Sequence, residues 1–444
     1  MTVMGTGSVT GSPLFAERLP AQTPDQALAS VAVLGLGYVG LPTSIGLAEQ
    51  GMRVIGVDVS ERRLQDVREG SVDLAGPDRE RLQAAIEVGG LALTSDPGAL
   101  HGADAVVVCV PTPVDELLKP DLRFIRAACA TAVAHARRDQ TIVLTSTTYV
   151  GTTRELLIRP LAERGLRPGR EVFVAFSPER IDPGNTRFAQ EDVPRVVGGA
   201  TTQCARAAAA IVGGVAARVH VVSSPEAAEM TKLYENTFRA VNIAFANEMA
   251  GASRSYGLDP LEVTRAAATK PYGFMPFYPG PGVGGHCIPC DPHYLLQGLR
   301  ERRGYAPVTE RAMKAIAMRP TAVTSRALDL LAEEGVHRGD ARVLVVGASY
   351  KPGVRDVRES PAVRIMRELA EEGVAVSYHD PLVRSLEVDE HLALLSVPRP
   401  HTEDYDLALM ITVHDGHDYT WLDSFEHVLD CTYGTPLGRE RVLI

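Results

Sequence analysis

Over residues 31–144, short apolar runs alternate with amphipathic stretches, a rhythm typical of strands and helices in a parallel α/β sheet. The expected strands are Val31–Leu34, Arg53–Asp58, Ala105–Val110 and Thr141–Leu144. Helices are expected up to Gln50, where Gly51 ends the pattern, and over Ile125–Arg138.

The same alternation returns after Gly339. It predicts a strand at Arg342–Val346, a helix at Pro361–Glu372 and a strand at Val374–Tyr378. Between the two alternating regions, a helical pattern runs without interruption from Pro225 to about Ser255, and its start offers a capping serine and an early proline. At 1.5 Å per residue this helix is about 45 Å long, which suits a connection between domains.

The pattern therefore predicts an α/β protein with two Rossmann-like doubly wound domains, joined by a central helical domain with a long connecting helix. We expect a flexible N-terminal extension over residues 1–29, because this stretch is rich in Gly, Ser, Thr and Pro and has no periodicity. The first doubly wound domain is expected over residues 30–215, the helical domain over 216–332 and the second doubly wound domain over 333–444.

Composition limits the classes of partner. Apolar residues make up 45% of the chain and charged residues 23%, as in ordinary globular proteins. The net charge of −10 argues against a general nucleic-acid binder, and no apolar run reaches the roughly 18 residues of a membrane span. Six cysteines form no disulfide framework, and the N-terminus lacks the features of a signal peptide. We therefore expect a cytoplasmic protein that binds neither nucleic acid nor membranes.

A glycine-rich turn, GLGYVG over residues 35–40, follows the first expected strand and opens a helix. Glycines at this spacing permit a tight turn and the close approach of a pyrophosphate, which sits at the helix N-terminus. Asp58 ends the next strand and would accept hydrogen bonds from the adenosine ribose. This role of Asp58 favours NAD over NADP. Arg62 and Arg63 lie close by in the sequence and weaken the preference for NAD. The alternative is a purely structural turn.

Cys287 lies in a loop dense in glycine and proline, PGVGGHCIPCDP over residues 281–292. With Cys290 it forms a C-x-x-C, which is typical of a redox pair, of half a zinc site or of two inert buried thiols. Zinc needs four ligands, and only His286 and His293 are at hand, so no metal is expected. We favour a nucleophile, because a cysteine beside a hydride acceptor can capture an aldehyde whose thiohemiacetal then loses a second hydride.

Two further candidates for chemistry lie on a helix and after a strand. Lys232 and Asn236 are four residues apart on the long helix, so both project from one face. A salt bridge between Lys232 and Glu229 is the structural alternative. Glu179, in the segment FSPERIDPG, is either a carboxylate base or an exposed turn residue.

Cations precede the helix expected at residue 361. Lys351, one of five lysines in the chain, follows the second glycine turn, and Arg355 and Arg358 come shortly after it. Cations before a helix N-terminus suit a diphosphate. The alternative is a solvated charged loop.

Six separated segments together resemble the UDP-glucose/UDP-mannuronate dehydrogenases, a family of nucleotide-sugar 6-dehydrogenases. They are VAVLGLGYVGLP, TSTTYVGTT, FSPERIDPGN, EMTKLYENTFRAVNIAFANEM, PGVGGHCIPCDP and SYKPGVRDVRESPA. The resemblance covers about residues 30–430. Within the family it is greatest to the UDP-N-acetylglucosamine 6-dehydrogenases, through segments 147–149, 182–185 and 274–280.

The resemblance implies NAD-dependent, four-electron oxidation of the C6 hydroxyl of a UDP-sugar to a uronate for polysaccharide biosynthesis. Cys287 would hold C6 as a thiohemiacetal and then as a thioester. The other catalytic roles implied are oxyanion stabilisation for Lys232 and Asn236, water binding for Asp291 and Thr147, and general base catalysis for Glu179. Residues expected to bind NAD are Gly35, Gly37, Tyr38, Val39, Gly40, Asp58, Arg63 and Thr112. Residues expected to bind the UDP-sugar are Tyr278, Gly282, Lys351 and Arg358.

Two positions depart from the family pattern. The family often has Asp-x-Arg after its last strand, whereas the segment Asp430-Cys-Thr-Tyr-Gly434 lacks the arginine and any nucleotide contact it would make. Cys290 stands where other members often carry a residue other than cysteine. A disulfide between Cys290 and Cys287 would inactivate the enzyme under oxidation.

UDP-GlcNAc is the expected substrate, with UDP-ManNAc and UDP-glucose as alternatives. A two-electron β-hydroxyacid dehydrogenase would also use a lysine and an asparagine on a helix but would not need Cys287. A non-catalytic NAD- or UDP-sugar-binding module would bind its ligand without forming NADH. The apolar spacing of Phe238, Val241, Phe245 and Met249 on the long helix serves either a subunit interface or packing within the chain. Because the family is usually oligomeric, we expect a homodimer or a higher homo-oligomer.

Overall fold

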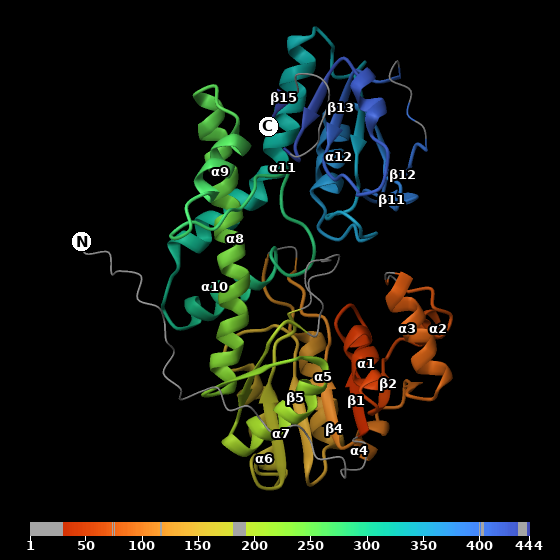
Figure 1. The fold of residues 1–444 in the computed structure, drawn as a ribbon, viewed down its shortest axis with the longest axis vertical. Coiled ribbons are helices and arrows are strands. Elements are labelled where there is room, and N and C mark those ends of the chain that lie inside the picture. Colours follow the sequence, from red (N-terminus) through yellow and green to blue (C-terminus); the bar gives the residue numbers. More distant parts are fainter. Residues whose placement is uncertain are drawn as a thin grey trace, which may run out of the picture. The chain divides into compact units, whose positions relative to one another are not determined.

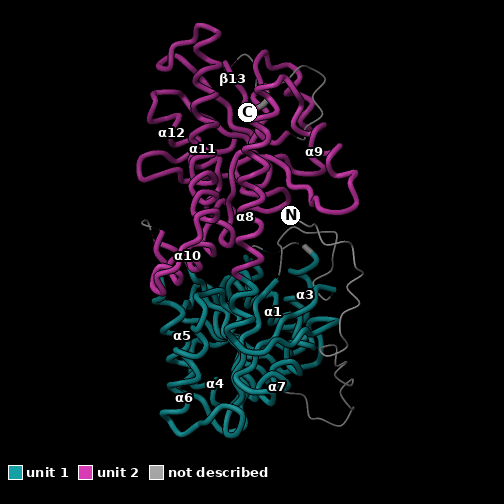
Figure 2. Tube along the Cα trace, turned by 90° about the vertical axis from the view of Figure 1, so that its left-hand side faces the viewer, with its two compact units in different colours: residues 1–112, 121–181, 186–232 teal, residues 113–120, 182–185, 233–444 magenta. Residues whose placement is uncertain are grey.

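The structure is a computed structural model that describes residues 30–444, except 73, 75, 116–117, 181–191, 399, 401–403 and 434–441. The chain divides into two compact units (Figure 2). Unit 1 comprises residues 1–112, 121–181 and 186–232, and unit 2 comprises residues 113–120, 182–185 and 233–444. The N-terminal extension predicted over residues 1–29 lies outside the described residues, and the division into three domains stays a prediction.

Unit 1 is built on a sheet whose strand order is β3-β2-β1-β4-β5-β6-β7-β8. The strands are β1 Ser30–Leu34, β2 Arg53–Val57, β3 Leu91–Thr94, β4 Ala105–Val108, β5 Gln140–Leu144, β6 Val172–Phe176, β7 Arg195–Gly199 and β8 Val219–Val222. Neighbouring strands are parallel except for β6 and β7, which are antiparallel. The order reverses between β1 and β4, and ligands of doubly wound sheets bind at the carboxyl ends of the strands at such a point.

Apolar cores lie on both faces of this sheet. Val31 and Val33 of β1 belong to one core, and Ala32 and Leu34 belong to the other, because successive side chains of a strand point to opposite faces. Burial on both faces explains why the strands of unit 1 are nearly continuous apolar runs. The helices around the sheet are α1 Gly40–Glu49, α2 Glu61–Arg68, α3 Gly76–Glu87, α4 Ala99–Gly102, α5 Arg123–His135, α6 Arg159–Glu163 and α7 Thr202–Val212.

Unit 2 combines long helices with a second parallel sheet, drawn in blue in Figure 1. The sheet order is β10-β9-β13-β14-β15, with β9 Arg342–Val346, β10 Ala375–His379, β13 Leu407–Met410, β14 Val428–Asp430 and β15 Val442–Leu443. A hairpin is formed by β11 Ser385–Glu387 and β12 Ala393–Leu395. The helices are α9 Pro260–Ala268, α10 Asp291–Glu301, α11 Pro307–Glu333 and α12 Pro361–Glu371. Buried side chains of α11, α12 and the sheet share one core.

The long helix α8 runs over Pro225–Ser255, as the sequence pattern predicts, and the boundary between the units falls within it, after Lys232. The predicted fold class is confirmed, with parallel strands in both sheets and a central helical part. Strand ends differ slightly from expectation, since Asp58 and Val110 lie beyond β2 and β4. Among the described helices, none combines the length and apolar character that a membrane span requires.

Candidate active site

The glycine turn of unit 1 joins β1 to α1 and has the geometry of a dinucleotide-binding turn. Gly35 has a φ of +93°, and a Cβ there would lie 2.8 Å from the carbonyl oxygen of Cys109. A Cβ at Gly40 would lie 1.8 Å from the carbonyl oxygen of Gly35, so this position permits close packing of helix on strand. A Cβ at Gly37 would meet nothing within 4 Å, which leaves the space that a pyrophosphate needs.

The start of α1 offers its backbone to an anion. Val39 occupies the N-cap position, and no side chain caps the helix. The first backbone N–H groups of a helix lack intrahelical partners and attract phosphate groups. Tyr38 is 40% exposed beside them. The residues present therefore fit a bound dinucleotide.

Asp58 links the turn to the second strand. Its Oδ2 accepts a hydrogen bond from the Leu36 backbone N–H at 2.9 Å, and its Oδ1 accepts one from the Ser60 N–H at 3.0 Å. The Arg63 Nε donates to the Leu36 carbonyl at 2.8 Å, so Arg63 is held against the same turn. A small cavity of about 40 Å³ is lined by Gly37, Tyr38, Leu41, Pro42, Arg63 and Leu74.

Two predicted threonines follow adjacent strands of unit 1. Thr112 comes after β4 and is buried, and Thr147 comes after β5 and is half-buried. After the same two strands, the Cys109 sulfur lies 3.0 Å from the Thr145 Oγ1, and burial raises the pKa of Cys109 to about 12. Cys109 is therefore a neutral thiol at physiological pH, in contrast to what a nucleophile requires.

Glu179 follows β6 and is buried, which contradicts the alternative of an exposed turn residue. Its carboxylate forms an ion pair with Arg195 of β7, which is itself buried. Its Oε1 accepts a hydrogen bond from the Arg180 backbone N–H at 2.7 Å. Arg195 was not predicted, because it lies on a different strand and belongs to no recognisable motif.

The first turns of α8 are fixed to the segment after β5 by Glu229. Its carboxylate accepts hydrogen bonds from the Gly151 and Thr153 backbone N–H groups and from the Thr153 hydroxyl, at 2.6–2.8 Å. Burial nevertheless raises the pKa of Glu229. Lys232, one turn further along, is 9% exposed, and within the described part of the chain no ion pair involves it. The alternative of a Glu229–Lys232 salt bridge is wrong.

In unit 2, the structure brings Cys287, Asn236 and Asp291 together. The Cys287 side chain is exposed, and its backbone carbonyl accepts a hydrogen bond from the Asp291 N–H at 2.8 Å. Asp291 is the first residue of α10, and its Oδ2 accepts a hydrogen bond from the Asn236 side-chain amide. Asn236 and Asp291 are both buried. Cys287 therefore stands one turn before a helix N-terminus, where an anionic side chain is favoured.

The structure bears on two other interpretations of the C-x-x-C, namely two inert buried thiols and part of a metal site. Exposure of Cys287 contradicts the interpretation of two inert buried thiols, although Cys290 is 4% exposed and burial raises its pKa to about 12. Over the described residues, no group of three or more His, Cys, Asp or Glu side chains is arranged to hold a metal ion.

The loop that carries Tyr278 and Gly282 is held through Gly280 by two helices. The Gly280 N–H donates to the Asn247 Oδ1 of α8, and its carbonyl accepts from the Arg319 Nε of α11, both at 2.9 Å. Gly282 has a φ of +153°, and a Cβ there would lie 2.9 Å from the Pro361 ring. Tyr278 is half exposed. No motif predicts the clamp that Asn247 and Arg319 form on Gly280.

The segment with the predicted cations adjoins this loop. The Gly285 N–H donates to the Arg358 carbonyl at 3.0 Å, and the Arg358 guanidinium forms an ion pair with Asp356 at 2.7 Å. Lys351 follows β9 and is half-buried in the turn before α12. Gly282 therefore adjoins the first residue of α12, and Lys351 and Arg358 belong to the segment that leads into this helix.

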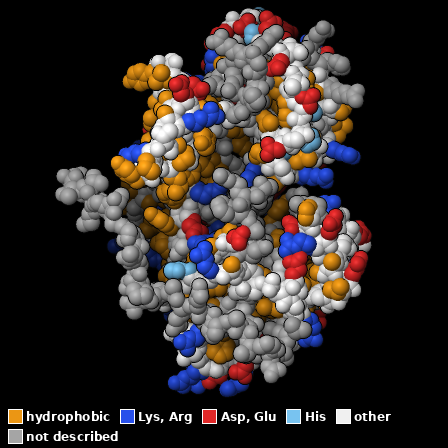
Figure 3. Space-filling view, in the orientation of Figure 1, with side chains coloured by type: hydrophobic (Ala, Val, Ile, Leu, Met, Phe, Trp, Pro, Cys, Tyr) orange, Lys and Arg blue, Asp and Glu red, His pale blue; other side chains and the backbone are white. Residues whose placement is uncertain are grey.

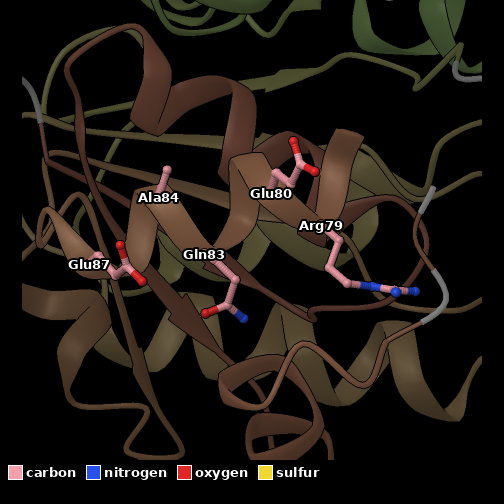
Figure 4. A pocket seen from close by; sticks show the side chains of 5 residues that line it. All are labelled: Arg79, Glu80, Gln83, Ala84 and Glu87. Carbon is pink, nitrogen blue, oxygen red and sulfur yellow. The ribbon is translucent and has the colours of Figure 1, made fainter. Parts of the chain in front are cut away.

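A broader hollow of about 470 Å³ lies on the surface of unit 1 (Figure 4). The side chains that line it, Arg79, Glu80, Gln83, Ala84 and Glu87, all come from α3. It contains none of the predicted site residues, and a single helix face encloses no ligand.

Comparison with known proteins shows which family the chain belongs to. Three profiles of the UDP-glucose/GDP-mannose dehydrogenase family match the chain: the NAD-binding domain over residues 29–215, the central domain over 226–316 and the UDP-binding domain over 344–432. The UDP-N-acetyl-D-glucosamine 6-dehydrogenase of Pseudomonas aeruginosa is 33% identical over 409 residues, covering 90% of this chain and 95% of that protein. The UDP-N-acetyl-D-mannosamine dehydrogenase of Pyrococcus horikoshii is 34% identical over 361 residues, covering 80% and 84%.

A solved structure shares the fold along nearly the whole chain. The UDP-D-ManNAc dehydrogenase from Pyrococcus horikoshii superposes with a TM-score of 0.84 at 30% identity, covering 94% of this chain and 99% of that one. Fold, glycine turn and matched domains together define an NAD-dependent nucleotide-sugar dehydrogenase. The chain belongs to the UDP-glucose/GDP-mannose dehydrogenase family, which confirms the resemblance drawn from the sequence.

Proposed function

We propose that this enzyme oxidises the C6 hydroxyl of UDP-GlcNAc to a carboxylate in two successive two-electron steps. The observation that carries this proposal is the exposed Cys287, one turn before α10 and adjacent to the buried Asn236–Asp291 pair. A two-electron alcohol oxidation needs no such nucleophile. A relative named as a UDP-N-acetyl-D-glucosamine 6-dehydrogenase, matched over 95% of its length, supports the choice of sugar.

The turn with Gly35, Gly37 and Gly40 would hold NAD, which would supply the hydride acceptor for each of the two oxidations of C6. The Cys287 thiolate adds to the C6 aldehyde and gives a thiohemiacetal, whose oxidation leaves a thioester. Asn236, fixed by its hydrogen bond to Asp291, positions the C6 oxygen. Asp291, which accepts that bond, is assigned to hold a water near C6.

In unit 1, Lys232 is assigned to stabilise negative charge on oxygen, and Glu179 and Thr147 are assigned to the attacking water. Lys232 is buried without an ion-pair partner in the described chain, so its ammonium is available to stabilise the developing oxyanion. Glu179 serves as the general base for thioester hydrolysis, with its rotamer held by Arg195. Thr147 assists in holding the attacking water.

NADH yield per sugar tests the proposal. We expect UDP-GlcNAc, taken to completion, to give two NADH per sugar and a uronate, because four electrons leave C6. UDP-ManNAc and UDP-glucose serve as competitors, and the highest kcat/KM identifies the substrate. One NADH per sugar would favour a simple alcohol oxidation, and ligand binding without NADH would favour a binding module.

We also propose that the enzyme is a cytoplasmic homodimer that pairs through α8 and α9. Apolar side chains gather over α9 and the adjoining part of α8 (Figure 3). The exposed ones are Phe245, Met249, Tyr256, Leu258 and Val263. Exposed apolar patches of this kind mark interaction surfaces. All six cysteines lie in the described residues and no disulfide joins them, which supports a reducing compartment.

Charge placed in this patch is expected to separate the subunits. Phe245→Glu with Met249→Glu should reduce the mass in solution from twice the 47.6-kDa chain to that of one chain, because buried unpaired charges of one sign oppose association. Light scattering coupled to gel filtration measures the mass. The control is Leu395→Glu, at a 75% exposed position on β12, which should leave the mass unchanged. A double variant that keeps the wild-type mass would refute this interface.

A further inference from the structure

The turn that carries Lys351 is the counterpart, in the second sheet, of the glycine turn in the first. Gly347 follows β9 with a φ of +90°, and a Cβ there would lie 2.0 Å from the Thr412 carbonyl oxygen. Asp380 follows β10 as Asp58 follows β2, and its Oδ2 accepts a hydrogen bond from the Ala348 N–H at 2.7 Å. Both turns are therefore held by an aspartate at the end of the neighbouring strand.

Asp380 differs from Asp58 in the number of hydrogen bonds that its two oxygens accept. Asp380 is 3% exposed and also accepts hydrogen bonds from the backbone N–H groups of Ser349, Leu382 and Val383 and from the His414 ring. Burial alone would raise the pKa of Asp380, but the hydrogen bonds from His414 and from backbone N–H groups outweigh it and lower the pKa to about 2. Asp380 is therefore an ionised anchor for its surroundings, whereas Asp58 is half-buried with fewer donors.

His414, which is 2% exposed, connects this anchor to the far end of the turn. Its Nδ1 lies 3.0 Å from the Gly353 backbone nitrogen, and its Nε2 lies 3.2 Å from the Asp380 Oδ2. A backbone N–H can only donate, so Nδ1 must be the acceptor and carries no proton. The ring is consequently the Nε2–H tautomer, and that proton is donated towards Asp380.

His414 contacts residues that precede and follow Lys351 in the sequence. Ser349, whose Oγ is 3.2 Å from the His414 Nε2, precedes Lys351 by two residues, and Gly353 follows it by two. The Ser349 hydroxyl also donates to the Lys351 carbonyl at 3.3 Å. One imidazole ring from the segment after β13 thus contacts the Ser349 hydroxyl before Lys351 and the Gly353 backbone N–H after it.

We propose that His414 is a positioning residue for the nucleotide diphosphate, which it serves by holding the turn 347–353 so that Lys351 faces the phosphates. This inference rests on the proposed function and on the expectation, drawn from the family resemblance, that Lys351 binds the UDP-sugar. The bond that matters is the one from the Gly353 N–H to Nδ1, because Asp380 keeps its backbone donors when the imidazole is lost. His414 itself touches no substrate atom in this role.

Two substitutions of His414 distinguish the hydrogen bond at Nδ1 from the hydrogen bond at Nε2. An asparagine side chain places its oxygen near the position of Nδ1, so His414→Asn keeps an acceptor for the Gly353 N–H. A glutamine side chain places its amide nitrogen near the position of Nε2, so His414→Gln keeps a donor for Asp380 and loses the Gly353 acceptor. The full-length enzyme is titrated with UDP by calorimetry, and KM is measured separately for the UDP-sugar and for NAD.

For His414→Gln, we expect UDP to bind about tenfold more weakly, as for the loss of one well-placed hydrogen bond, and the KM of the UDP-sugar to rise in step. For His414→Asn, UDP affinity should stay within about twofold of the wild type. The KM of NAD should be unchanged in both, because the glycine turn belongs to unit 1. A general loss of structure would change both KM values.

The outcomes separate this inference from the proposed function. Equal UDP affinity in the wild type and His414→Gln would overturn the positioning role alone. Tenfold weaker binding by His414→Asn would also overturn it, since the Asp380 contact would then be decisive, and this variant decides the question if His414→Gln does not fold. A wild-type enzyme that does not bind UDP would refute the nucleotide assignment of the turn and the inference with it.

Discussion

Replacement of Cys287 by serine is expected to abolish uronate formation, with the rate of the complete reaction falling by at least about 10³-fold. A serine hydroxyl at this position is a far weaker nucleophile, and it cannot form the thioester from which water releases the product. NADH release and uronate, measured on the same sample of UDP-GlcNAc, check the expectation. NADH should not exceed one per sugar, and no carboxylate should appear.

The matched control is Cys290→Ser, in the same turn and three residues away. Cys290 is buried and its pKa is raised to about 12, so it has no part in the addition to C6. This variant should retain two NADH per sugar. A Cys287→Ser enzyme that still yields two NADH and a uronate would refute the covalent route, whatever the sugar proves to be.

Features that depend on nearby residues were predictable. The glycine turn is one, because the positive φ of Gly35 and the tight contact at Gly40 are imposed within a single strand–turn–helix segment. Asp58 lies 22 positions beyond Leu36, and its hydrogen bond to that residue follows from the pairing of two parallel strands. The N-terminal position of Asp291 on α10 is equally local.

Features that depend on distant pairing were not predictable. The suggested Glu229–Lys232 pair fails because the Glu229 carboxylate is taken by Gly151 and Thr153, far away in the sequence. The residues next to Glu179 in the sequence do not predict its ion pair with Arg195. This ion pair depends on the antiparallel pairing of β7 with β6.

A proline makes α11, one of the longest helices, difficult to predict from the sequence. Pro320 lies inside α11, although a proline within a helical pattern ordinarily ends or kinks the helix. The apolar side chains of Val323 and Ala327 explain its continuation, since both are completely buried in the core shared with α12 and the second sheet. Tertiary packing here outweighs a local preference. Arg319, one residue before Pro320, donates a hydrogen bond to Gly280. This contact also depends on tertiary packing and could not be predicted from the local sequence.

Mild treatment with hydrogen peroxide is expected to inactivate the enzyme completely and reversibly. Cys287 and Cys290 stand three residues apart in a turn closed by the hydrogen bonds of the Cys290 and Asp291 N–H groups to the Cys287 carbonyl. Positions i and i+3 of such a turn share one face. Cys287 is exposed and Cys290 is 4% exposed with a raised pKa, so the peroxide reacts first at Cys287.

The reaction balances without a further reagent. The Cys287 sulfur attacks one peroxide oxygen, the O–O bond breaks, and a sulfenic acid and one water form. The Cys290 sulfur then attacks the Cys287 sulfur and displaces the hydroxyl as a second water, so two thiols and one peroxide give one disulfide and two waters. The nucleophile is thereby blocked but protected from irreversible oxidation.

Cys290→Ser separates this disulfide from simple oxidation of the nucleophile. Without a resolving thiol, the sulfenic acid at Cys287 proceeds to the sulfinic acid, which dithiothreitol does not reduce. After peroxide, dithiothreitol should restore the wild type and leave Cys290→Ser inactive, and intact-protein mass should show the loss of two hydrogens in the former and the gain of two oxygens in the latter. Equal recovery of the two enzymes would mean that Cys290 does not reach Cys287, and that the C-x-x-C is not a redox pair.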